Sequence, residues 1–381
     1  MKPVWVLMSA IGVVGANSLV LSPIATDVAR SFAGRGASDV MLASAVYGAG
    51  TALSALFLAP QADRIGLKRA LLWALTVLAA ALVASALAPT LPVLVLAQGV
   101  TGLGAGLALP AIYGLAADIA PKGQESETLG KVLTGWTLSL VAGVSLSAVL
   151  ADLLHWRAVF AVMAVASASL WVSVRRLEVT RKVAAEVSTS PLGAFRVAGV
   201  KPVLVAVAAF MGAFYGVYAF LGTHMTATLG YSTAIAGLAS LIYGIGFGAV
   251  APLDRLIDRF GAAKAAPVVF VALMLVYLLM AGVAQSGAAV LGVCLIWGAV
   301  NHLGLNIMVG QLSALSISQR GAILGLYSAT TYAAMFIGTA AFGRVYSAYG
   351  FQVIAVLSAI CILPAVIGAV LRRGTTLMPA Q

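Results

Sequence analysis

Charged side chains are scarce in this sequence. Asp, Glu, Lys and Arg make up 9% of the 381 residues, whereas hydrophobic residues make up 62%. A soluble globular domain has about 25% charged residues, so this composition excludes a water-soluble fold. It predicts a protein that crosses the lipid bilayer many times.

Cysteine is nearly absent as well. Cys294 and Cys361 are the two cysteines, and both fall in long apolar runs, where cysteine packs as a small apolar residue. They provide neither a disulfide framework nor a cluster of metal ligands. The sequence also lacks a Gly-x-x-x-x-Gly-Lys-Ser/Thr phosphate loop and a His-Glu-x-x-His zinc motif. We therefore expect no metal, no cofactor, no use of ATP and no enzymatic activity.

Acidic residues are outnumbered two to one. The chain has 22 Lys and Arg against 11 Asp and Glu, a net charge of +11. Binding of nucleic acid would require the cations to gather on one soluble face. Here they are scattered between apolar runs, so we expect no nucleic-acid partner.

Long apolar runs are what the sequence has in abundance. About 20 apolar residues span a bilayer as a helix, and this length predicts twelve transmembrane helices and an all-α membrane protein. The first six cover residues 4–28, 40–62, 70–89, 92–117, 129–151 and 157–174. The second six cover residues 201–225, 232–253, 266–285, 288–313, 322–346 and 351–371.

The loops between these spans differ sharply in charge. Assigning them alternately to the two sides places 18 of the 22 Lys and Arg residues on one side. The other side receives Arg30, Arg35, Arg157 and Arg344. Because cytoplasmic loops carry the excess of Lys and Arg, both termini are predicted to be cytoplasmic, in a plasma membrane such as the bacterial inner membrane.

The two halves of the chain repeat one another. A charged turn at residues 63–66 recurs 195 positions later at residues 258–261, and Gly130, Gly143 and Trp156 match Gly325, Gly338 and Phe351 at the same offset. The pattern predicts two pseudo-symmetric six-helix bundles, residues 1–174 and 201–381, joined by a cytoplasmic linker at 175–200. Such a duplication is typical of secondary transporters, whose substrate site lies between the two repeats.

Four motifs resemble a known family. Residues 59–71 resemble the signature that major facilitator superfamily members carry between their second and third helices, although Ala59, Gln61 and Leu67 depart from it. Residues 98–106 are similar to a glycine-rich pattern of the fourth helix, with Gln98 where Arg is expected. Residues 143–147 and 155–160 resemble patterns of the fifth and sixth helices. The resemblance covers essentially the whole chain and points to the twelve-helix drug and sugar efflux branch, whose members resemble drug:proton antiporters.

The resemblance implies a conformational latch at the cytoplasmic ends of the helices. Charges there would pair when the cytoplasmic side closes and separate when the two halves rock apart, because ion pairs can bias a two-state element. The implied residues are Asp63, Arg64, Gly66, Lys68, Arg69, Asp118, Asp258 and Arg259. The alternative is that these residues only form turns and set the topology.

Two ionisable residues are candidates for proton coupling. His302 is at the middle of the predicted tenth helix, and histidine titrates near neutral pH. Its alternative role is a neutral histidine hydrogen-bonded to a neighbouring helix. Asp27 follows Pro23, which is expected to kink the first helix, and its alternative role is that of a solvated acid at a helix end.

Polar and aromatic residues on the helices that line the central cavity of relatives form a candidate substrate cavity. They are Asn17, Gln98, Thr101, Tyr215, Tyr218, His302 and Asn306, with Trp136, Tyr327, Thr331 and Tyr332 as a second tier. Such groups in an apolar cleft suit a neutral or amphipathic ligand. The alternative for each is a hydrogen bond between helices.

These observations predict a secondary active transporter that works as a monomer. We expect it to export a small organic solute, drug-like or sugar-like, by proton antiport with alternating access. An uncoupled facilitator or an importer of a small neutral solute is the second possibility. An intramembrane enzyme or a receptor would need a catalytic constellation or a soluble domain, and the sequence has neither.

Overall fold

The computed structural model describes residues 2–121, 124–178, 191–316 and 319–376. Its N-terminal half contains α1 (Pro3–Leu19), α2 (Leu21–Arg30), α3 (Ala37–Phe57), α4 (Ala59–Ile65), α5 (Leu67–Ala86), α6 (Leu91–Ile119), α7 (Glu125–Leu138), α8 (Ser145–Leu153) and α9 (Trp156–Arg175). A π-helical segment, Ser139–Val144, joins α7 to α8 into one span.

The C-terminal half contains α10 (Val200–Thr223), α11 (Thr233–Ala249), α12 (Asp254–Phe260), α13 (Ala262–Gly282), α14 (Gly287–Leu315), α15 (Arg320–Cys361) and α16 (Leu363–Thr376). The π-helical segment His224–Thr228 extends α10, and short 3-10 turns lie at Pro191–Arg196 and Ala251–Leu253. Every regular element of the described residues is thus a helix, as predicted.

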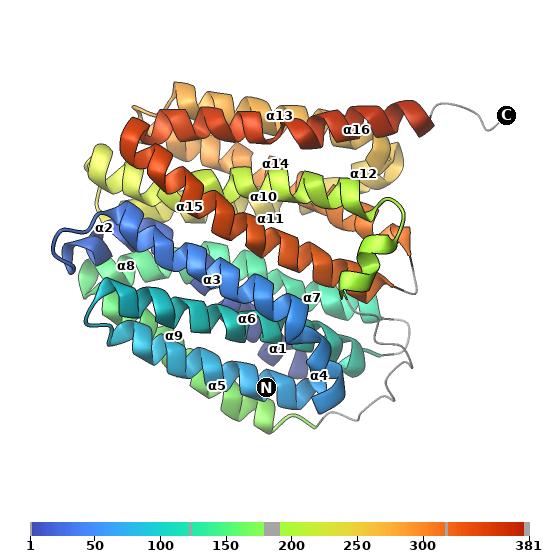
Figure 1. Cartoon of the computed structure of the whole chain (residues 1–381), viewed down its shortest axis with the longest axis horizontal. Helices are drawn as coiled ribbons and strands as arrows, with labels where there is room; N and C mark the ends of the chain where they lie inside the picture. Colours follow the sequence, from blue (N-terminus) through green and yellow to red (C-terminus); the bar gives the residue numbers. More distant parts are fainter. Residues whose placement is uncertain (1, 122–123, 179–190, 317–318, 377–381) are drawn as a thin grey trace.

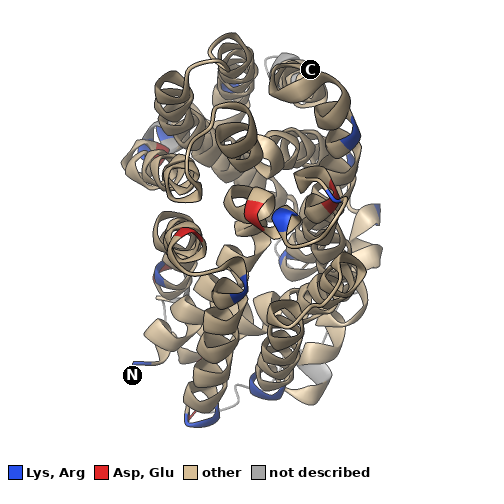
Figure 2. Cartoon of the chain, turned by 90° about the vertical axis from the view of Figure 1, so that its left-hand side faces the viewer, with Lys and Arg blue, Asp and Glu red and all other residues tan. Residues whose placement is uncertain are grey.

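The helices lie side by side in two groups. Figure 1 shows the N-terminal half below the C-terminal half, with the short helices α4 and α12 at the same right-hand end of the molecule. We call this end the hinge end and the opposite one, which carries α2, the α2 end. Figure 2 looks along the helix axes from the α2 end and shows few Lys, Arg, Asp and Glu residues among the others.

The number of spans agrees with the prediction. Within the described residues, the structure has ten helices that are long and apolar enough to cross a membrane. The number is eleven if α1 and α2 form one bent span. One of them, Arg320–Leu371, is 52 residues long, whereas about 20 residues cross a bilayer. Gly350 interrupts it with a φ of 79°. Because this stretch therefore forms two spans, the structure is consistent with twelve.

The first span is broken at the predicted proline. α1 ends at Leu19, and α2 is bent away from it by 52°. Pro23 has no backbone N–H, and its ring would collide with the carbonyl four residues earlier, which belongs to Leu19. The helix therefore breaks where that carbonyl loses its partner, and α2 becomes a separate ten-residue segment.

The two halves repeat the same close contact between helices. In each, two glycines let backbones touch, since an added Cβ would lie 2.0–2.3 Å from a facing carbonyl oxygen. The pairs are Gly50 with Gly99 and Gly102 with Tyr47 between α3 and α6, and Gly246 with Leu295 and Gly298 with Tyr243 between α11 and α14. Each C-terminal residue follows its N-terminal counterpart by 196 positions, so the duplication seen in the sequence extends to helix packing.

The charged turns repeat as well. Gly66 follows α4 with a φ of 91°, and Gly261 follows α12 with a φ of 83°. This left-handed region is readily adopted by glycine and disfavoured for residues with a Cβ. The charged turns predicted at residues 63–66 and 258–261 therefore end at Gly66 and Gly261, where the chain reverses.

The predicted linker is partly described. α9 ends at Arg175 and α10 begins at Val200, and between them the turn Pro191–Arg196 packs against α15, with Pro191 near Gly325. Residues 179–190 lie outside the described residues. The boundaries of the two bundles, at 174 and 201, stay a prediction.

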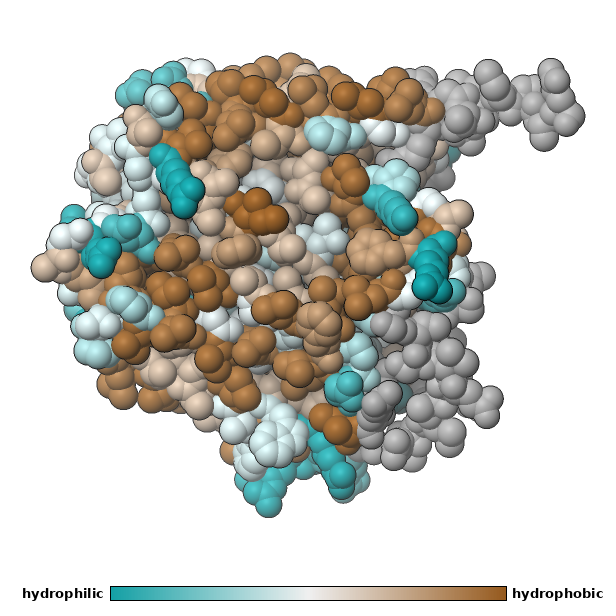
Figure 3. Space-filling model, viewed as in Figure 1, coloured by the Kyte–Doolittle hydropathy of each residue, from teal (hydrophilic) through white to brown (hydrophobic). Residues whose placement is uncertain are grey.

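The surface between the two ends is apolar. Figure 3 shows a broad hydrophobic band with hydrophilic residues toward the ends. Large hydrophobic side chains such as Trp73 on α5, Val165 on α9 and Val268 on α13 are about two-thirds exposed, at 65%, 66% and 65%. In water such exposure would be unfavourable, but facing lipid it is expected. The chain is therefore an integral membrane protein.

The glycine contacts generate a prediction about stability. Gly298→Ala should destabilise the C-terminal half, because the added Cβ would lie 2.0 Å from the Tyr243 carbonyl oxygen. Overpacking of this kind costs about 1–3 kcal/mol, so the melting temperature in detergent should fall. Gly292→Ala on the same helix is the control, since its Cβ would meet nothing within 4 Å. Equal melting temperatures of the two variants would refute the packing argument.

Candidate functional site

Near the α2 end, four hydrogen bonds between described residues join the two halves. The hydroxyl of Ser22 donates to the Tyr218 carbonyl, and Thr233 donates to Asp27 Oδ2. The hydroxyls of Thr26 and Thr226 lie 2.7 Å apart, and those of Ser38 and Ser347 lie 2.8 Å apart. We call this set the α2 gate. It holds the α2 end closed in this structure.

Asp27 is part of this gate. Its carboxylate accepts a hydrogen bond from Arg30 Nη1 at 2.9 Å as well as the one from Thr233, and its side chain is 20% exposed. The structure thus places Asp27, one of the two proton-coupling candidates, near the α2 end, in contact with both halves. Its role in proton coupling stays a prediction.

Gly222 on α10 brings the two halves into backbone contact at the gate. A Cβ at this position would lie 2.2 Å from the Ser22 carbonyl oxygen and 2.5 Å from the Cα of Pro23. Any larger residue would therefore push α2 away from α10. The gate closes this far because position 222 has no side chain.

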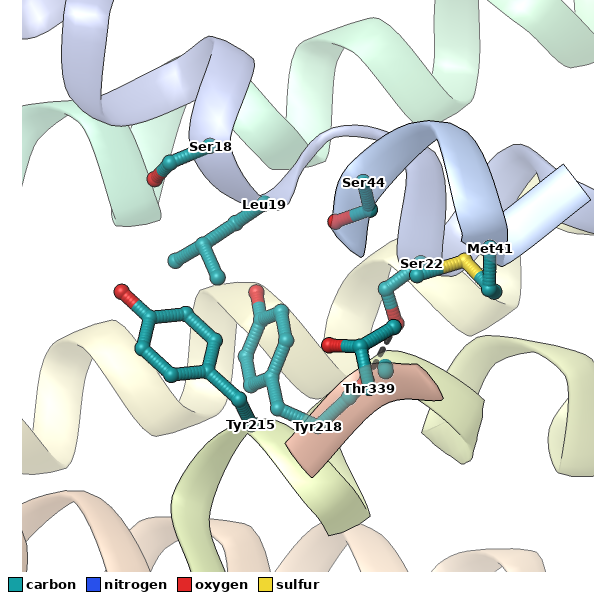
Figure 4. Close-up of a pocket in the computed structure, with 9 residues that line it drawn as sticks. Ser18, Leu19, Ser22, Met41, Ser44, Tyr215, Tyr218 and Thr339 are labelled. Carbon is teal, nitrogen blue, oxygen red and sulfur yellow. Dashed lines mark hydrogen bonds between the residues drawn. The ribbon is translucent and has the colours of Figure 1, made fainter. Parts of the chain in front are cut away.

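A small cavity lies beside the gate, between α1, α2, α3, α10 and α15. Figure 4 shows Tyr215 and Tyr218 standing next to one another on its floor, with Leu19 pointing toward them. Ser18, Ser22, Met41, Ser44, Ala219 and Thr339 complete the lining. Its volume is about 10 Å³, roughly one water molecule. The gate region is therefore too tightly packed for an organic solute in this conformation.

Five tyrosines from both halves form a group that includes Tyr215 of the cavity lining. We call Tyr47 on α3, Tyr113 on α6, Tyr215 on α10, and Tyr327 and Tyr332 on α15 the tyrosine cluster. Their phenol groups are close enough to interact electrostatically, and the rings of Tyr47 and Tyr332 meet edge to face at 6.4 Å. The cluster therefore spans the boundary between the halves.

Exposure changes across this cluster. Tyr47, Tyr215 and Tyr332 are buried, whereas Tyr113 and Tyr327, nearer the hinge ends of their helices, are half-buried. Trp136 on α7 interacts with Tyr113 and is itself half-buried. The region between the halves is thus closed at the α2 end and partly exposed toward the hinge end.

Three predicted cavity residues make hydrogen bonds within the N-terminal half, and their role in substrate binding stays a prediction. Asn17 Nδ2 donates to Gln98 Oε1 at 3.1 Å, and Gln98 Nε2 donates to Ser85 Oγ at 3.0 Å. Gln98 is fully buried, and Thr101 donates to the Ala97 carbonyl of its own helix. An amide can both donate and accept, so Gln98 links α1, α6 and α5.

The two candidates on α14 have different surroundings. His302 Nε2 lies 3.0 Å from Asp254 Oδ2, at the start of α12, while Asn306 is half-buried one turn further. The neighbouring Asn301, absent from the predicted set, donates to the Tyr243 hydroxyl at 3.0 Å. Nothing in the sequence indicated Asp254 as a partner of His302, because it lies 48 residues away and just outside the predicted span 232–253.

Comparison with known proteins now adds to this geometry. The family model described as Major Facilitator Superfamily matches residues 7–339. The chain belongs to the Major Facilitator Superfamily. It is a transporter of a small molecule rather than an enzyme.

Relatives and a solved structure agree with this assignment. An uncharacterized transporter of the superfamily from Bacillus subtilis, YwfA, is 30% identical over 368 residues, covering 94% of this chain and 88% of the relative. A chloramphenicol resistance protein from Streptomyces lividans is 26% identical over 263 residues, covering 68% and 67%. The crystal structure of a D-xylose-proton symporter matches with a TM-score of 0.73 at 17% identity, covering 94% and 96%, and shows the same fold.

The latch residues of this superfamily member are described only in part. Lys68 Nζ donates to the Leu177 carbonyl at 2.6 Å, which holds α5 to the end of α9. Arg69 and Arg259 are exposed, and Asp118 is half-buried near the end of α6. The side chains of Asp63, Arg64 and Asp258 lie outside the described residues. The latch therefore stays a prediction.

The Gln98 bridge predicts a stability effect. Gln98→Ala should lower the melting temperature, because it leaves the Asn17 amide and the Ser85 hydroxyl buried without their shared partner. An unsatisfied buried group costs about 1–3 kcal/mol. Thr101→Val is the control on the same helix, since it removes a hydrogen bond within one helix. If both variants melted alike, Gln98 would have no special role in packing.

The close approach at Gly222 predicts a shift in conformation. In a variant that carries Ser44→Cys and lacks Cys294 and Cys361, Gly222→Ala should speed modification of residue 44 by a maleimide in detergent. The added Cβ would prevent α2 from closing, and Ser44 is buried while the gate is closed. Gly212→Ala on the same helix is the control, because its Cβ would meet nothing within 4 Å. An unchanged rate for Gly222→Ala would contradict the gate.

Proposed function

We propose that this transporter exports a small, uncharged or amphipathic organic solute in exchange for protons. The observation that carries the proposal is the tyrosine cluster, which draws on both halves and is closed at one end and partly exposed at the other. A solute held there would touch both halves, so its binding would depend on how they are arranged. This is the requirement of alternating access about a site between two repeats.

The chemistry of the cluster favours an uncharged solute. Phenol rings offer flat apolar faces together with hydroxyl groups that donate and accept hydrogen bonds. The cluster and the small cavity contain no acidic or basic side chain among their described members. A fully charged solute would therefore lose its hydration without gaining an ion pair, which is unfavourable.

The distribution of charge supports an orientation of the chain in the membrane. The side that carries 18 of the 22 Lys and Arg residues includes the turns at the hinge end, and we propose that this end faces the cytoplasm, with both termini there. The cluster then opens toward the cytoplasm in this structure and would load its solute from the cell interior. For a bacterial chain, we propose a monomer in the inner membrane.

Similarity to a resistance protein supports export of a drug-like molecule. Chloramphenicol is a neutral aromatic compound, so its chemistry fits the tyrosine cluster, and the Streptomyces lividans relative carries its name. A sugar-like solute, which the sequence allowed equally, would use the hydroxyl groups but little of the ring surface. We therefore propose a drug-like aromatic solute as the substrate class.

Transport into inverted vesicles tests this proposal. Vesicles that contain the purified protein, sorted for an outward-facing hinge end, should accumulate radiolabelled chloramphenicol when their interior is acidic. Exchange of one proton per neutral solute allows up to about tenfold accumulation per pH unit. Ethidium, a permanent cation, and D-xylose, a neutral sugar, are the comparison solutes, and vesicles without protein give the background.

Other outcomes would replace the proposal. Equilibration of solute without accumulation, unaffected by collapse of the pH gradient, would identify an uncoupled facilitator. Accumulation only in vesicles of the opposite orientation, with acid outside, would identify an importer. Preference for ethidium would refute the argument for an uncharged solute.

A further inference from the structure

His302 and Asp254 form a partly buried pair between α14 and α12. Nε2 and Oδ2 lie 3.0 Å apart, and the side chains are 17% and 30% exposed. His302 is the sixteenth of the 29 residues of α14, so it lies about halfway along that span. Lys131 and Glu127, a pair on α7, are by contrast about 60% exposed.

Each partner also has a buried polar atom without a hydrogen bond. Among the described residues, Nδ1 of His302 and Oδ1 of Asp254 have no partner. An ionised carboxylate can only accept, so in its contact with a neutral ring Nε2 is the donor and Nδ1 is the acceptor. Nδ1 is thus a vacant position for one further proton.

From the pair, a series of ring contacts leads to the tyrosine cluster. The His302 ring meets Phe247 edge to face at 4.8 Å, and Phe247 contacts Tyr243 at 6.2 Å. Tyr243 and Phe214 lie 5.6 Å apart, and Phe214 and Tyr215 lie 5.0 Å apart. Because the rings pack directly on one another, rearrangement at the cluster changes the packing that covers His302.

We propose that His302 and Asp254 together carry the proton that this transporter exchanges for its solute. The proposal rests on the proton antiport proposed above and assigns its site. A proton binds His302 Nδ1, which converts the pair from a net charge of −1 to an ion pair of net charge zero. Its departure restores the neutral ring beside the carboxylate.

The environment of the pair makes its proton affinity depend on conformation. Burial penalises a lone negative charge more than a neutral ion pair. In this structure the Asp254 side chain is 30% exposed, so water reaches the carboxylate, the deprotonated pair is tolerated, and the proton leaves toward the hinge end. When the hinge end closes, the pair loses water and holds its proton. With the hinge end cytoplasmic, this difference moves protons inward.

Other charged groups on the surrounding elements do not compete for this role. Those with described side chains are exposed cations: Arg255 and Arg259 on α12, Lys264 on α13, Lys201 on α10 and Arg320 on α15. The side chain of Asp258 on α12 lies outside the described residues. Tyr243 on α11 reaches the pair through the Phe247 ring, and a phenol does not ionise near neutral pH.

Labelling of residue 44 as a function of pH tests the proposal without a substrate. In the Ser44→Cys variant that lacks Cys294 and Cys361, acid should favour the protonated pair, the closed hinge end and the open α2 gate. After correction for thiol ionisation, measured on the denatured protein, modification should be faster at pH 5.5 than at pH 8.0. A conformational coupling of ordinary size predicts a difference of about fivefold or more.

Three variants decide the assignment. His302→Gln and Asp254→Asn should each abolish the pH dependence of labelling and the accumulation driven by a pH gradient, while exchange of labelled for unlabelled chloramphenicol without a gradient continues. Asp152→Asn, which removes an exposed acid, should leave the pH dependence unchanged. Elution as a single peak in size-exclusion chromatography confirms that each variant is folded.

The failures of the two proposals are distinguishable. Retained pH dependence in both pair variants, or loss of it in Asp27→Asn alone, would overturn the assignment of His302 and Asp254. A wild-type labelling rate that does not vary with pH would overturn it too. Absence of proton-driven accumulation by the wild type would instead refute the antiport.

Discussion

The bilayer gives the backbone no hydrogen-bond partners, and this constraint determines how the molecule is held together. Each span must be helical to satisfy its own N–H and C=O groups, and apolar contact between helices gains little in a medium that is itself apolar. The helices are therefore held together mainly by packing at close backbone approach. The paired glycine contacts between α3 and α6 and between α11 and α14 provide it in both halves, and buried amides such as Gln98 reinforce it.

The contact between the halves is of a different kind. Hydroxyl groups, one carboxylate and the backbone contact at Gly222 form the α2 gate. Hydroxyl hydrogen bonds can be exchanged for bonds to water, so they open at a modest cost. A firm interior within each half and an exchangeable boundary between them are what two-state rocking requires. The tyrosine cluster lies on that boundary, where movement of either half alters it.

Much of the fold could be predicted because its signals are local. The length of the apolar runs predicted the spans. Pro23 predicted the break in the first helix, and the charged turns predicted the chain reversals at Gly66 and Gly261. The site was harder, because these helices are apolar on all sides and no amphipathic pattern shows which face points inward. Gln98, for example, was predicted to line the cavity, and the structure shows it bridging three helices, while its part in substrate binding stays a prediction. Tyr47 was overlooked, and Asp254 became recognisable as a partner of His302 only once folding brought α12 beside α14.

The break at Leu19 gives the short helix α2 an unusual independence. The segment supplies the N-terminal side of three of the four gate bonds, through Ser22, Thr26 and Asp27, yet it is bent by 52° from the helix that anchors it. Replacements on its ten residues can thus alter the α2 gate while the helix contacts inside each half stay in place. During evolution, a change of substrate in such a chain can therefore begin with substitutions in α2.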